Sequence, residues 1–267
     1  MQKTLLALAI LSFAAAASAA PDSQETPLHP IKDGRYTVTT GYEHSNIKSG
    51  NMKQSNDNFT LRGRADIPLA QQHAIRAELG YTRRSFDVKV DGVTWVDGGK
   101  ADDIDLYVGY LYSPSGFKQG GLRVGGGLGY FSSDSNARAH RTAHAPNIVD
   151  DDLSSLYLKA QVEYEQDLGG GWSITPWGEA QVSLRDRTET KWSQAYAIPD
   201  ETHKGSSYSI GLGVDAQKQF TPNLALTFGP YYQYAHSKTN ARDHAGDHFD
   251  SSSGRAHVFG IRAGLRF

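Results

Sequence analysis

The chain ends in Phe259-Gly260-Ile261-Arg262-Ala263-Gly264-Leu265-Arg266-Phe267. Every second residue of this stretch is apolar, and the residues between them are either Gly or Arg. Successive side chains of a β-strand point to opposite faces, so the alternation predicts a strand with one apolar face and one face that is polar or bare. A helix would repeat its apolar residues every three or four positions instead.

The same alternation recurs in nine earlier segments. Together the candidate strands cover residues 36–42, 59–67, 75–81, 104–112, 122–130, 156–164, 172–184, 208–216, 224–234 and 259–267. Short turns at 68–74, 113–121, 166–171 and 217–223 alternate with longer polar stretches at 44–58, 87–103, 132–155, 186–207 and 236–256. Short turns at one end and long loops at the other are typical of outer-membrane barrels.

The sequence therefore predicts an all-β fold, an antiparallel up-and-down transmembrane β-barrel of about ten strands. Eight and twelve strands are the alternatives, because residues 86–90 and 93–96 around Asp91-Gly92 could form an additional hairpin. A soluble exported β protein also alternates, but its second face would be solvated. Here that face is rich in Gly, which weakens a strand unless another group must approach closely, as it must in a narrow lumen.

The N-terminal part indicates export. Lys3, an apolar run and the small residues Ala17-Ser18-Ala19 predict a signal peptide at 1–19, followed by a periplasmic lead-in at 20–34 and the barrel at 35–267. No later stretch is apolar for long enough to span an inner membrane as a helix. The 267 residues hold 27 Lys and Arg against 29 Asp and Glu, and no Cys. This balance argues against nucleic acid as a partner, and the lack of Cys excludes disulfides and thiol chemistry.

Aromatic residues fall at two heights of the expected barrel, as lipid-facing girdles do. The outer set is Tyr42, Phe59, Tyr81, Tyr130, Tyr208, Tyr234 and Phe259, and the inner set is Tyr36, Tyr112, Tyr164, Trp172 and Phe267. With the signal peptide and the terminal strand ending on Phe267, this pattern resembles the integral outer-membrane β-barrel proteins of Gram-negative bacteria. The resemblance implies a location in the cell outer membrane, contact with its lipid and lipopolysaccharide, and recognition of the last strand by the barrel-assembly machinery.

Charged residues alternate with the apolar face and should line the lumen. The expected lumen-lining residues are Arg62, Arg64, Arg76, Arg123, Lys159, Glu163, Glu165, Glu179, Arg185, Asp215, Arg262 and Arg266. Strands ten, one, two and three would form a basic wall opposite an acidic wall on strands six to eight. We expect a narrow porin-like channel for small hydrophilic or charged solutes. The alternative is a structural or surface-recognition barrel whose charges pair and plug the lumen, because small barrels are filled by their own side chains.

An enzyme is the less favoured reading. Ten-stranded outer-membrane barrels include the omptin proteases, and Asp102, Asp103, Asp105, Asp200 and His203 are rim residues that could activate water. One residue separates the omptin Asp and His, whereas two residues, Glu201 and Thr202, lie between Asp200 and His203 here. His140, His144 and the His and Asp residues of 242–250 could hold a metal but are equally typical of solvated loops. We expect no catalytic residue, metal site or cofactor.

Overall fold

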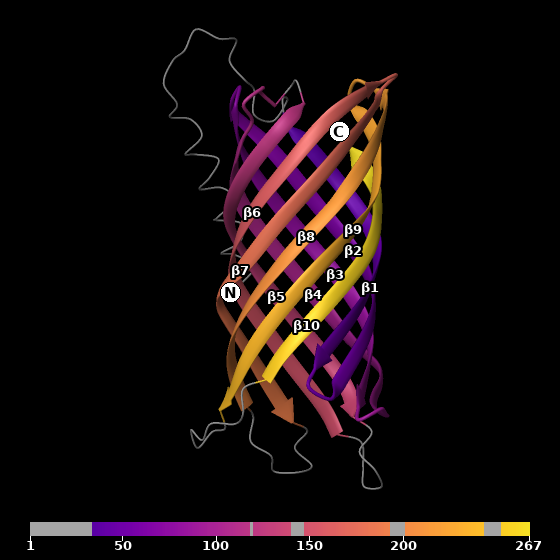
Figure 1. Ribbon diagram of the computed structural model, residues 1–267, viewed down its shortest axis with the longest axis vertical. Coiled ribbons are helices and arrows are strands. Elements are labelled where there is room, and N and C mark those ends of the chain that lie inside the picture. The colour runs from indigo at the N-terminus through magenta and orange to yellow at the C-terminus, as the bar shows by residue number, and fades with distance from the viewer. Residues whose placement is uncertain (1–33, 118–119, 140–146, 193–200, 243–251) are drawn as a thin grey trace.

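The computed structural model describes residues 34–117, 120–139, 147–192, 201–242 and 252–267, which form ten strands (Figure 1). They are β1 (Arg35–Ser49), β2 (Met52–Ala70), β3 (His73–Val90), β4 (Val93–Tyr112), β5 (Gly121–Ala139), β6 (Asn147–Gly169), β7 (Trp172–Trp192), β8 (Glu201–Thr221), β9 (Leu224–Arg242) and β10 (Ser252–Arg266). Each strand pairs antiparallel with its neighbours in the chain, and β1 pairs with β10. The fold is the predicted closed up-and-down barrel. The expected signal peptide at 1–19 lies outside the described residues.

The first and last strands close the ring. Tyr36 N–H donates to Phe267 O at 3.1 Å, and Phe267 N–H donates back to Tyr36 O at 2.8 Å. The pairing continues to Ser49 opposite Gly254, so the barrel has no free edge along this seam. No helix among the described residues is long and apolar enough to cross a membrane.

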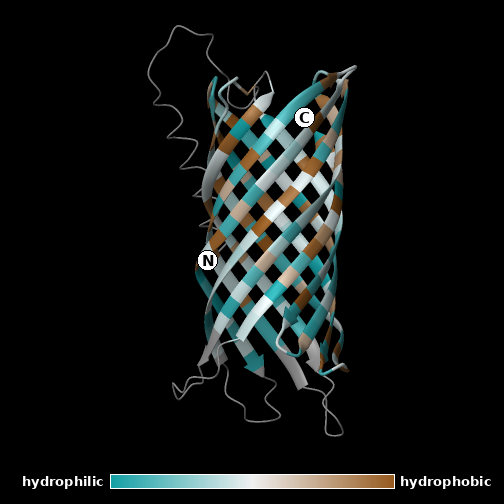
Figure 2. Cartoon of the chain, viewed as in Figure 1, coloured by the Kyte–Doolittle hydropathy of each residue, from teal (hydrophilic) through white to brown (hydrophobic). Residues whose placement is uncertain are grey.

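Apolar side chains cover the outside of the barrel. Val38, Leu61, Ile210 and Ile261 each expose about half of their surface (46%, 46%, 53% and 59%). The aromatic residues predicted for the outer girdle share this face, with Tyr42 opposite Phe59 across β1 and β2. Figure 2 shows hydrophobic and hydrophilic residues alternating along the strands. Apolar residues outside and charged residues inside are what a lipid-facing barrel requires.

The outer ends of the strands extend well beyond the aromatic girdle. Residues 44–58 and 87–103, predicted as loops, instead continue β1 into β2 and β3 into β4. The strands also extend into the predicted loops 132–155, 186–207 and 236–256, where residues 132–139, 147–155, 186–192, 201–207, 236–242 and 252–256 are strand. The β1–β2 turn lies at Gly50, which has a φ of +56°, and the β3–β4 turn at Asp91 and Gly92. Residues 86–90 and 93–96 are therefore the tips of β3 and β4 rather than an additional hairpin. The loop prediction failed because the outward face of these extensions is largely polar, so the apolar alternation that marks a lipid-facing strand stops there.

A small apolar cluster stabilises the protruding β2–β4 sheet from inside. Phe86, Val88, Val96 and Ala101 are buried together, with Met52 and Val90 packed against them. Gly99 lies opposite Phe86 and leaves room for its ring, since a Cβ at Gly99 would overlap the ring carbons. Inward Gly residues accommodate aromatic rings in the same way at Gly129 beneath Tyr157 and Gly260 beneath Tyr231. Close approach of a neighbouring side chain explains why Gly recurs on this face.

Candidate functional site: the lumen and its outer vestibule

Ion pairs cross the lumen from one wall to the other. In the closed ring, β6 lies five strands from β1, which places the two strands on opposite walls. Arg35 on β1 contacts Glu165 on β6 at 2.7 Å, and Arg64 on β2 contacts Glu163 on β6 at 3.1 Å. The side chains of the two walls therefore meet in the middle of the lumen.

Arg76 is the most deeply buried member of this network. Its guanidinium is fully buried and donates to both oxygens of Asp66 on β2, at 2.7 and 2.8 Å. It also donates across the lumen to Gln161 at 2.8 Å and to Glu163 at 2.5 Å. Arg123 contacts Glu163 and Glu165 as well. A buried charge of this kind is tolerated only when it is fully paired and hydrogen-bonded, which these partners achieve.

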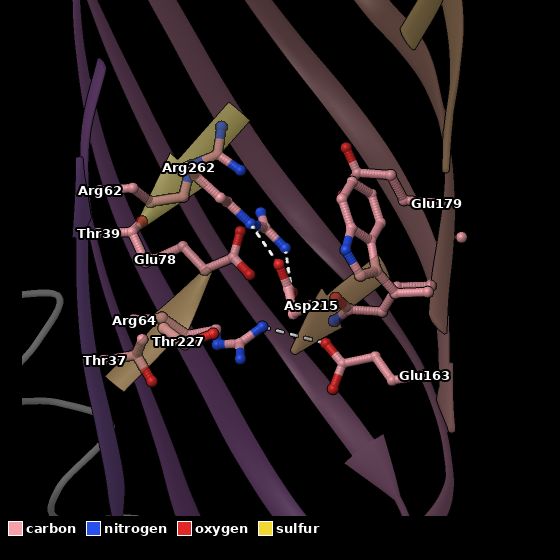
Figure 3. Close-up of a pocket in the computed structure, with 13 residues that line it drawn as sticks. Thr37, Thr39, Arg62, Arg64, Glu78, Glu163, Glu179, Asp215, Thr227 and Arg262 are labelled. Atoms are coloured by element: carbon pink, nitrogen blue, oxygen red, sulfur yellow. Dashed lines mark hydrogen bonds and ion pairs between the residues drawn. The ribbon is translucent and has the colours of Figure 1, made fainter. Parts of the chain in front are cut away.

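A second group of pairs lies further along the lumen, and Figure 3 shows its members Arg262 and Asp215. The ammonium group of Lys159 contacts Glu78 at 2.5 Å and Glu179 at 3.8 Å, and it lies 3.9 Å from the centroid of the Tyr107 ring. Arg262 binds Asp215 through two hydrogen bonds of 3.0 and 2.5 Å. A void lined by Glu78, Glu179, Asp215 and Arg262 among others measures about 50 Å³, enough for a few water molecules.

The periplasmic end of the lumen is also filled. Ala74, Leu111 and Phe117 form a buried apolar cluster, and Phe117 comes from the turn between β4 and β5. Phe117 N–H donates to Gln71 O at 3.0 Å, which holds this turn against the turn between β2 and β3. Arg35 donates to Phe117 O from inside. Phe117 therefore occupies part of the periplasmic end of the lumen.

The outer part of the lumen holds a cavity of about 440 Å³, which we call the vestibule. Hydroxyl and amide side chains such as Asn58, Thr60, Gln181 and Ser209 line much of it. Its carboxylates are Glu43, Asp103, Asp105, Glu179 and Asp186. Arg62 borders both the vestibule and the smaller void beneath it. The vestibule is thus a polar, predominantly acidic cup whose floor is the ion-pair network.

The carboxylates of the vestibule are held mainly by neutral donors. Glu43 accepts hydrogen bonds from the Tyr231 hydroxyl and from Asn58. The Tyr157 hydroxyl donates to Asp105 at 2.5 Å, and the Ser155 hydroxyl donates to Asp186 at 2.5 Å. Neutral donors orient a carboxylate without cancelling its charge, so Glu43, Asp105 and Asp186 present negative charge to the cavity.

The structure places the expected lumen residues on the inward face with one exception. Arg62, Arg64, Arg76, Arg123, Lys159, Glu163, Glu165, Glu179, Asp215, Arg262 and Arg266 all face inward. Arg185 differs: it is exposed and lies opposite Leu156, a lipid-facing residue. The register between β6 and β7 shifts at Leu156 and Tyr157, and such a bulge moves the following side chains to the other face.

Sequence reasoning did not identify the aromatic and amide residues of the lumen. Tyr107, Gln161 and Trp177 line the ion-pair network, and Trp177 lies 4.6 Å from the Arg262 guanidinium. The alternation along β4, β6 and β7 could have identified them, because each occupies an inward position between outward apolar residues. The aromatic residues predicted from the sequence are those of the two girdles alone.

The residues of the protease alternative do not converge on one point. Asp102 faces outward and accepts a hydrogen bond from Tyr81, whereas Asp103 faces inward and pairs with Arg84 at 2.8 Å. His203 lies on β8 opposite Thr188, and Asp200 falls outside the described residues. Within the described ranges, no group of three His, Asp or Glu residues is placed to hold a metal. His140, His144 and residues 243–250 lie outside those ranges.

Comparisons with known proteins agree with the fold and the location. The family model described as outer membrane protein OpcA matches residues 31–267. The outer-membrane protease OmpT of Escherichia coli is 13% identical with a TM-score of 0.58, and the match covers 92% of this chain and 99% of that one. The translocator domain of the autotransporter NalP from Neisseria meningitidis is 13% identical with a TM-score of 0.50, over 97% of both chains. No curated protein sequence matches. At these identities the solved structures support the barrel architecture alone.

Proposed function

The chain belongs to the OpcA family of outer-membrane proteins. From its buried ion pairs and its outer cavity, we propose that it is a surface-recognition barrel with a closed lumen. In this proposal the ion pairs seal the membrane level, and the vestibule binds a ligand from outside the cell. The barrel then serves as a rigid support that holds the vestibule and the protruding strands above the membrane. Loops and rims on a rigid scaffold are common places for binding function.

The burial of Arg76 and Glu163 is the observation that carries this proposal. Their side chains expose 0% and 7% of their surface although both point into the lumen. A solute crossing at this height would have to separate charges that come from opposite walls. Breaking such a buried pair costs about 3–5 kcal/mol, and passage would expose several pairs at once.

Planar-bilayer recording tests the closed lumen. We expect the refolded protein, with insertion verified by its heat-modifiable migration, to give no discrete conductance steps. The variant Arg76→Gly/Glu163→Gly is the matched comparison, since it removes the two side chains that meet in the middle and should produce steps. Discrete steps from the unaltered protein would overturn the closed lumen.

A narrow porin-like channel is the second candidate. The void of about 50 Å³ among Arg64, Glu163, Asp215 and Arg262 favours it, because water could enter between the two walls. In that case Arg62→Ala/Arg64→Ala/Arg76→Ala should weaken or reverse the ion preference measured in a salt gradient. An unchanged reversal potential in a conducting barrel would remove the basic wall from the channel's selectivity.

The vestibule suits a hydroxyl-rich ligand that carries an amino group. Its volume falls within the range of about 300–1,000 Å³ common for small-molecule sites. Hydroxyl and amide side chains can bind sugar-like hydroxyls, and the carboxylates Glu43 and Asp186 can bind an ammonium group. Attraction between these carboxylates and a cation supplies both affinity and orientation.

Calorimetric titration with a pair of probes tests this chemistry. Glucosamine at pH 6 should bind, whereas N-acetylglucosamine, which has the same ring but no charge, should bind about tenfold more weakly. Asp186→Asn should reduce glucosamine binding, and Glu189→Gln on the same strand should not, because Glu189 pairs with Arg187 outside the cavity. Equal affinity for the two sugars would remove the carboxylates from ligand selection.

A further inference from the structure

Four basic residues lie side by side on the outer face, beyond the aromatic girdle. The strand register places Arg255 on β10 opposite Lys48 on β1, and Lys48 opposite Lys53 on β2. Lys53 in turn lies opposite Lys89 on β3. All four side chains are exposed. We call them the basic row; its members occupy four consecutive strands, which are spaced about 4.8 Å apart.

In the described strands, the carboxylates near the basic row do not pair with it directly. None of its four members forms an ion pair within the described residues, although like charges directly opposite one another destabilise a sheet. Elsewhere on the same outer surface cations are paired, as in Lys191 with Asp152 at 2.7 Å. The nearest carboxylate along β3, Asp87, accepts a hydrogen bond from Gly98 N–H at 2.8 Å. The row is therefore a positive stripe without a direct ion pair, although the exposed carboxylates Asp87 and Asp91 each lie two residues from Lys89.

The position of the row is lateral rather than at the mouth. Lys48 lies on the same face of β1 as Tyr42 and Val38, which face lipid. Arg255 lies four residues beyond the girdle residue Phe259, and Lys89 lies eight residues beyond Tyr81. For tilted strands this places the row roughly 10 to 20 Å above the girdle. A ligand held here stands beside the barrel, where headgroups of the outer leaflet reach.

We propose that the basic row binds the phosphate-bearing headgroup and inner sugars of the glycolipid that surrounds the barrel in the outer leaflet. Lys ammonium groups bind phosphate as point charges, and a stripe of them matches a headgroup with several anionic groups. The acyl chains of the same molecule would lie along the apolar wall beneath, over residues such as Val38 and Tyr42. The row is thus the polar half of a lipid site whose apolar half is the barrel wall.

Binding of labelled lipopolysaccharide in detergent micelles, measured by fluorescence anisotropy, tests the assignment. The unaltered protein should bind intact lipopolysaccharide and lose affinity for enzymatically dephosphorylated lipopolysaccharide. Lys48→Gln/Lys53→Gln should weaken binding of the intact glycolipid by about tenfold or more, and the loss should shrink as salt is raised. The variant Lys48→Arg/Lys53→Arg keeps both charges and should bind the intact glycolipid about as well as the unaltered protein.

Two lysines outside the row provide the control. Lys100 and Lys238 are also exposed, but their cross-strand neighbours are the uncharged residues Ser85 and Asn136 for Lys100 and Ser206 and Ser253 for Lys238. Lys100→Gln/Lys238→Gln should bind within twofold of the unaltered protein. Equal losses in both variants, or equal binding of dephosphorylated glycolipid, would overturn the proposal. So would binding of soluble dextran sulfate through the row without binding of the glycolipid.

Discussion

The charges of the lumen and those of the basic row are arranged in opposite ways; the row lies on the collar, as we call the strand ends that protrude beyond the aromatic girdle. In the lumen, Arg76 is surrounded by Asp66, Gln161 and Glu163, so opposite charges meet across the full width. On the collar, Arg255 and Lys48 lie directly opposite each other with no counter-charge. Water accounts for the difference, because an unpaired charge is costly when buried and nearly free when hydrated. Pairing of buried charges therefore points to a structural role in the lumen, whereas the unpaired charges of the basic row are available to the proposed ligand.

Breaking the ion-pair network of the lumen should lower the free energy of unfolding more than the other changes. Glu163→Ala would remove the partner of Arg76, Arg64 and Arg123, and should lower the free energy of unfolding by about 3–5 kcal/mol. Urea titration of the refolded protein measures it. Glu189→Ala on the collar, where the carboxylate of Glu189 pairs with Arg187 in water, should cost at most about 1 kcal/mol. Similar losses in the two variants would contradict the comparison.

Packing should show the same contrast between inside and outside. Gly129→Ala would place a methyl group into the Tyr157 ring and should cost about 1–3 kcal/mol. Gly63→Ala, on the lipid-facing side of β2 with nothing within 4 Å of its added Cβ, should be neutral or slightly stabilising. The same urea titrations compare the pair. A destabilised Gly63→Ala variant would show that the outer wall is less tolerant than its open surface indicates.

Reversing one charge of the basic row should slightly raise the free energy of unfolding. Lys48→Glu would place a carboxylate between Arg255 and Lys53 and should stabilise the protein by roughly 0.2–1 kcal/mol. The same change should abolish binding of intact lipopolysaccharide. Lys238→Glu, opposite Ser206 and Ser253, is the control and should alter stability by less. A destabilised Lys48→Glu variant would mean that the row contributes to the fold itself.

Two aspartates of the extracellular part should titrate in opposite directions. Hydrogen bonds from His44 and Tyr42 lower the pKa of Asp57 on the outer face, whereas burial raises the pKa of Asp151 on the inner face. The contribution of Asp57 to stability is therefore present above its unfolded pKa and is lost as the pH falls through the lower folded value. Any contribution of Asp151 is instead lost as the pH rises through its raised value.

Carboxyl NMR titration of the refolded protein measures both aspartates. Asp57→Asn and Asp151→Asn assign the two signals and should each remove one transition. Because Asp57 is exposed, its effect on stability is the smallest of those proposed here. Shifts in the same direction for both groups would remove the distinction between the two faces of the collar.

The lipid-facing half of the fold was predictable from the sequence because lipid imposes a strict rule. Every second residue from Phe259 to Phe267 must be apolar, and the same rule identified ten strands. The apolar alternation ends where the strands leave the lipid. The sequence therefore predicts loops at 44–58 and 87–103, where the structure has extended hairpins. The predicted inward position of Arg185 is wrong for a related reason. A single β-bulge moves the following side chains to the opposite face of the strand, and the alternation of residue types does not reveal it.

The pairing inside the lumen was less predictable. The opposition of a basic and an acidic wall followed from strand order, but the reach of Arg64 to Glu163 depends on how the strands tilt and shear. A few ångströms decide between an open water-filled lumen and a closed one. The basic row was also hidden, because Lys48, Lys53, Lys89 and Arg255 are scattered through the chain and meet only through register.

The seam between β1 and β10 is held by the same backbone pairing as any other pair of strands, with Tyr36 and Phe267 bonded to each other at the periplasmic end. The position of the chain break is therefore arbitrary with respect to the finished ring. Joining residues 35 and 267 by a short linker and opening the chain between Thr221 and Leu224 would preserve every strand pair. Such a circular permutant would reach the same barrel while ending on β8, which would separate what the closed structure needs from the expected recognition of the last strand during assembly.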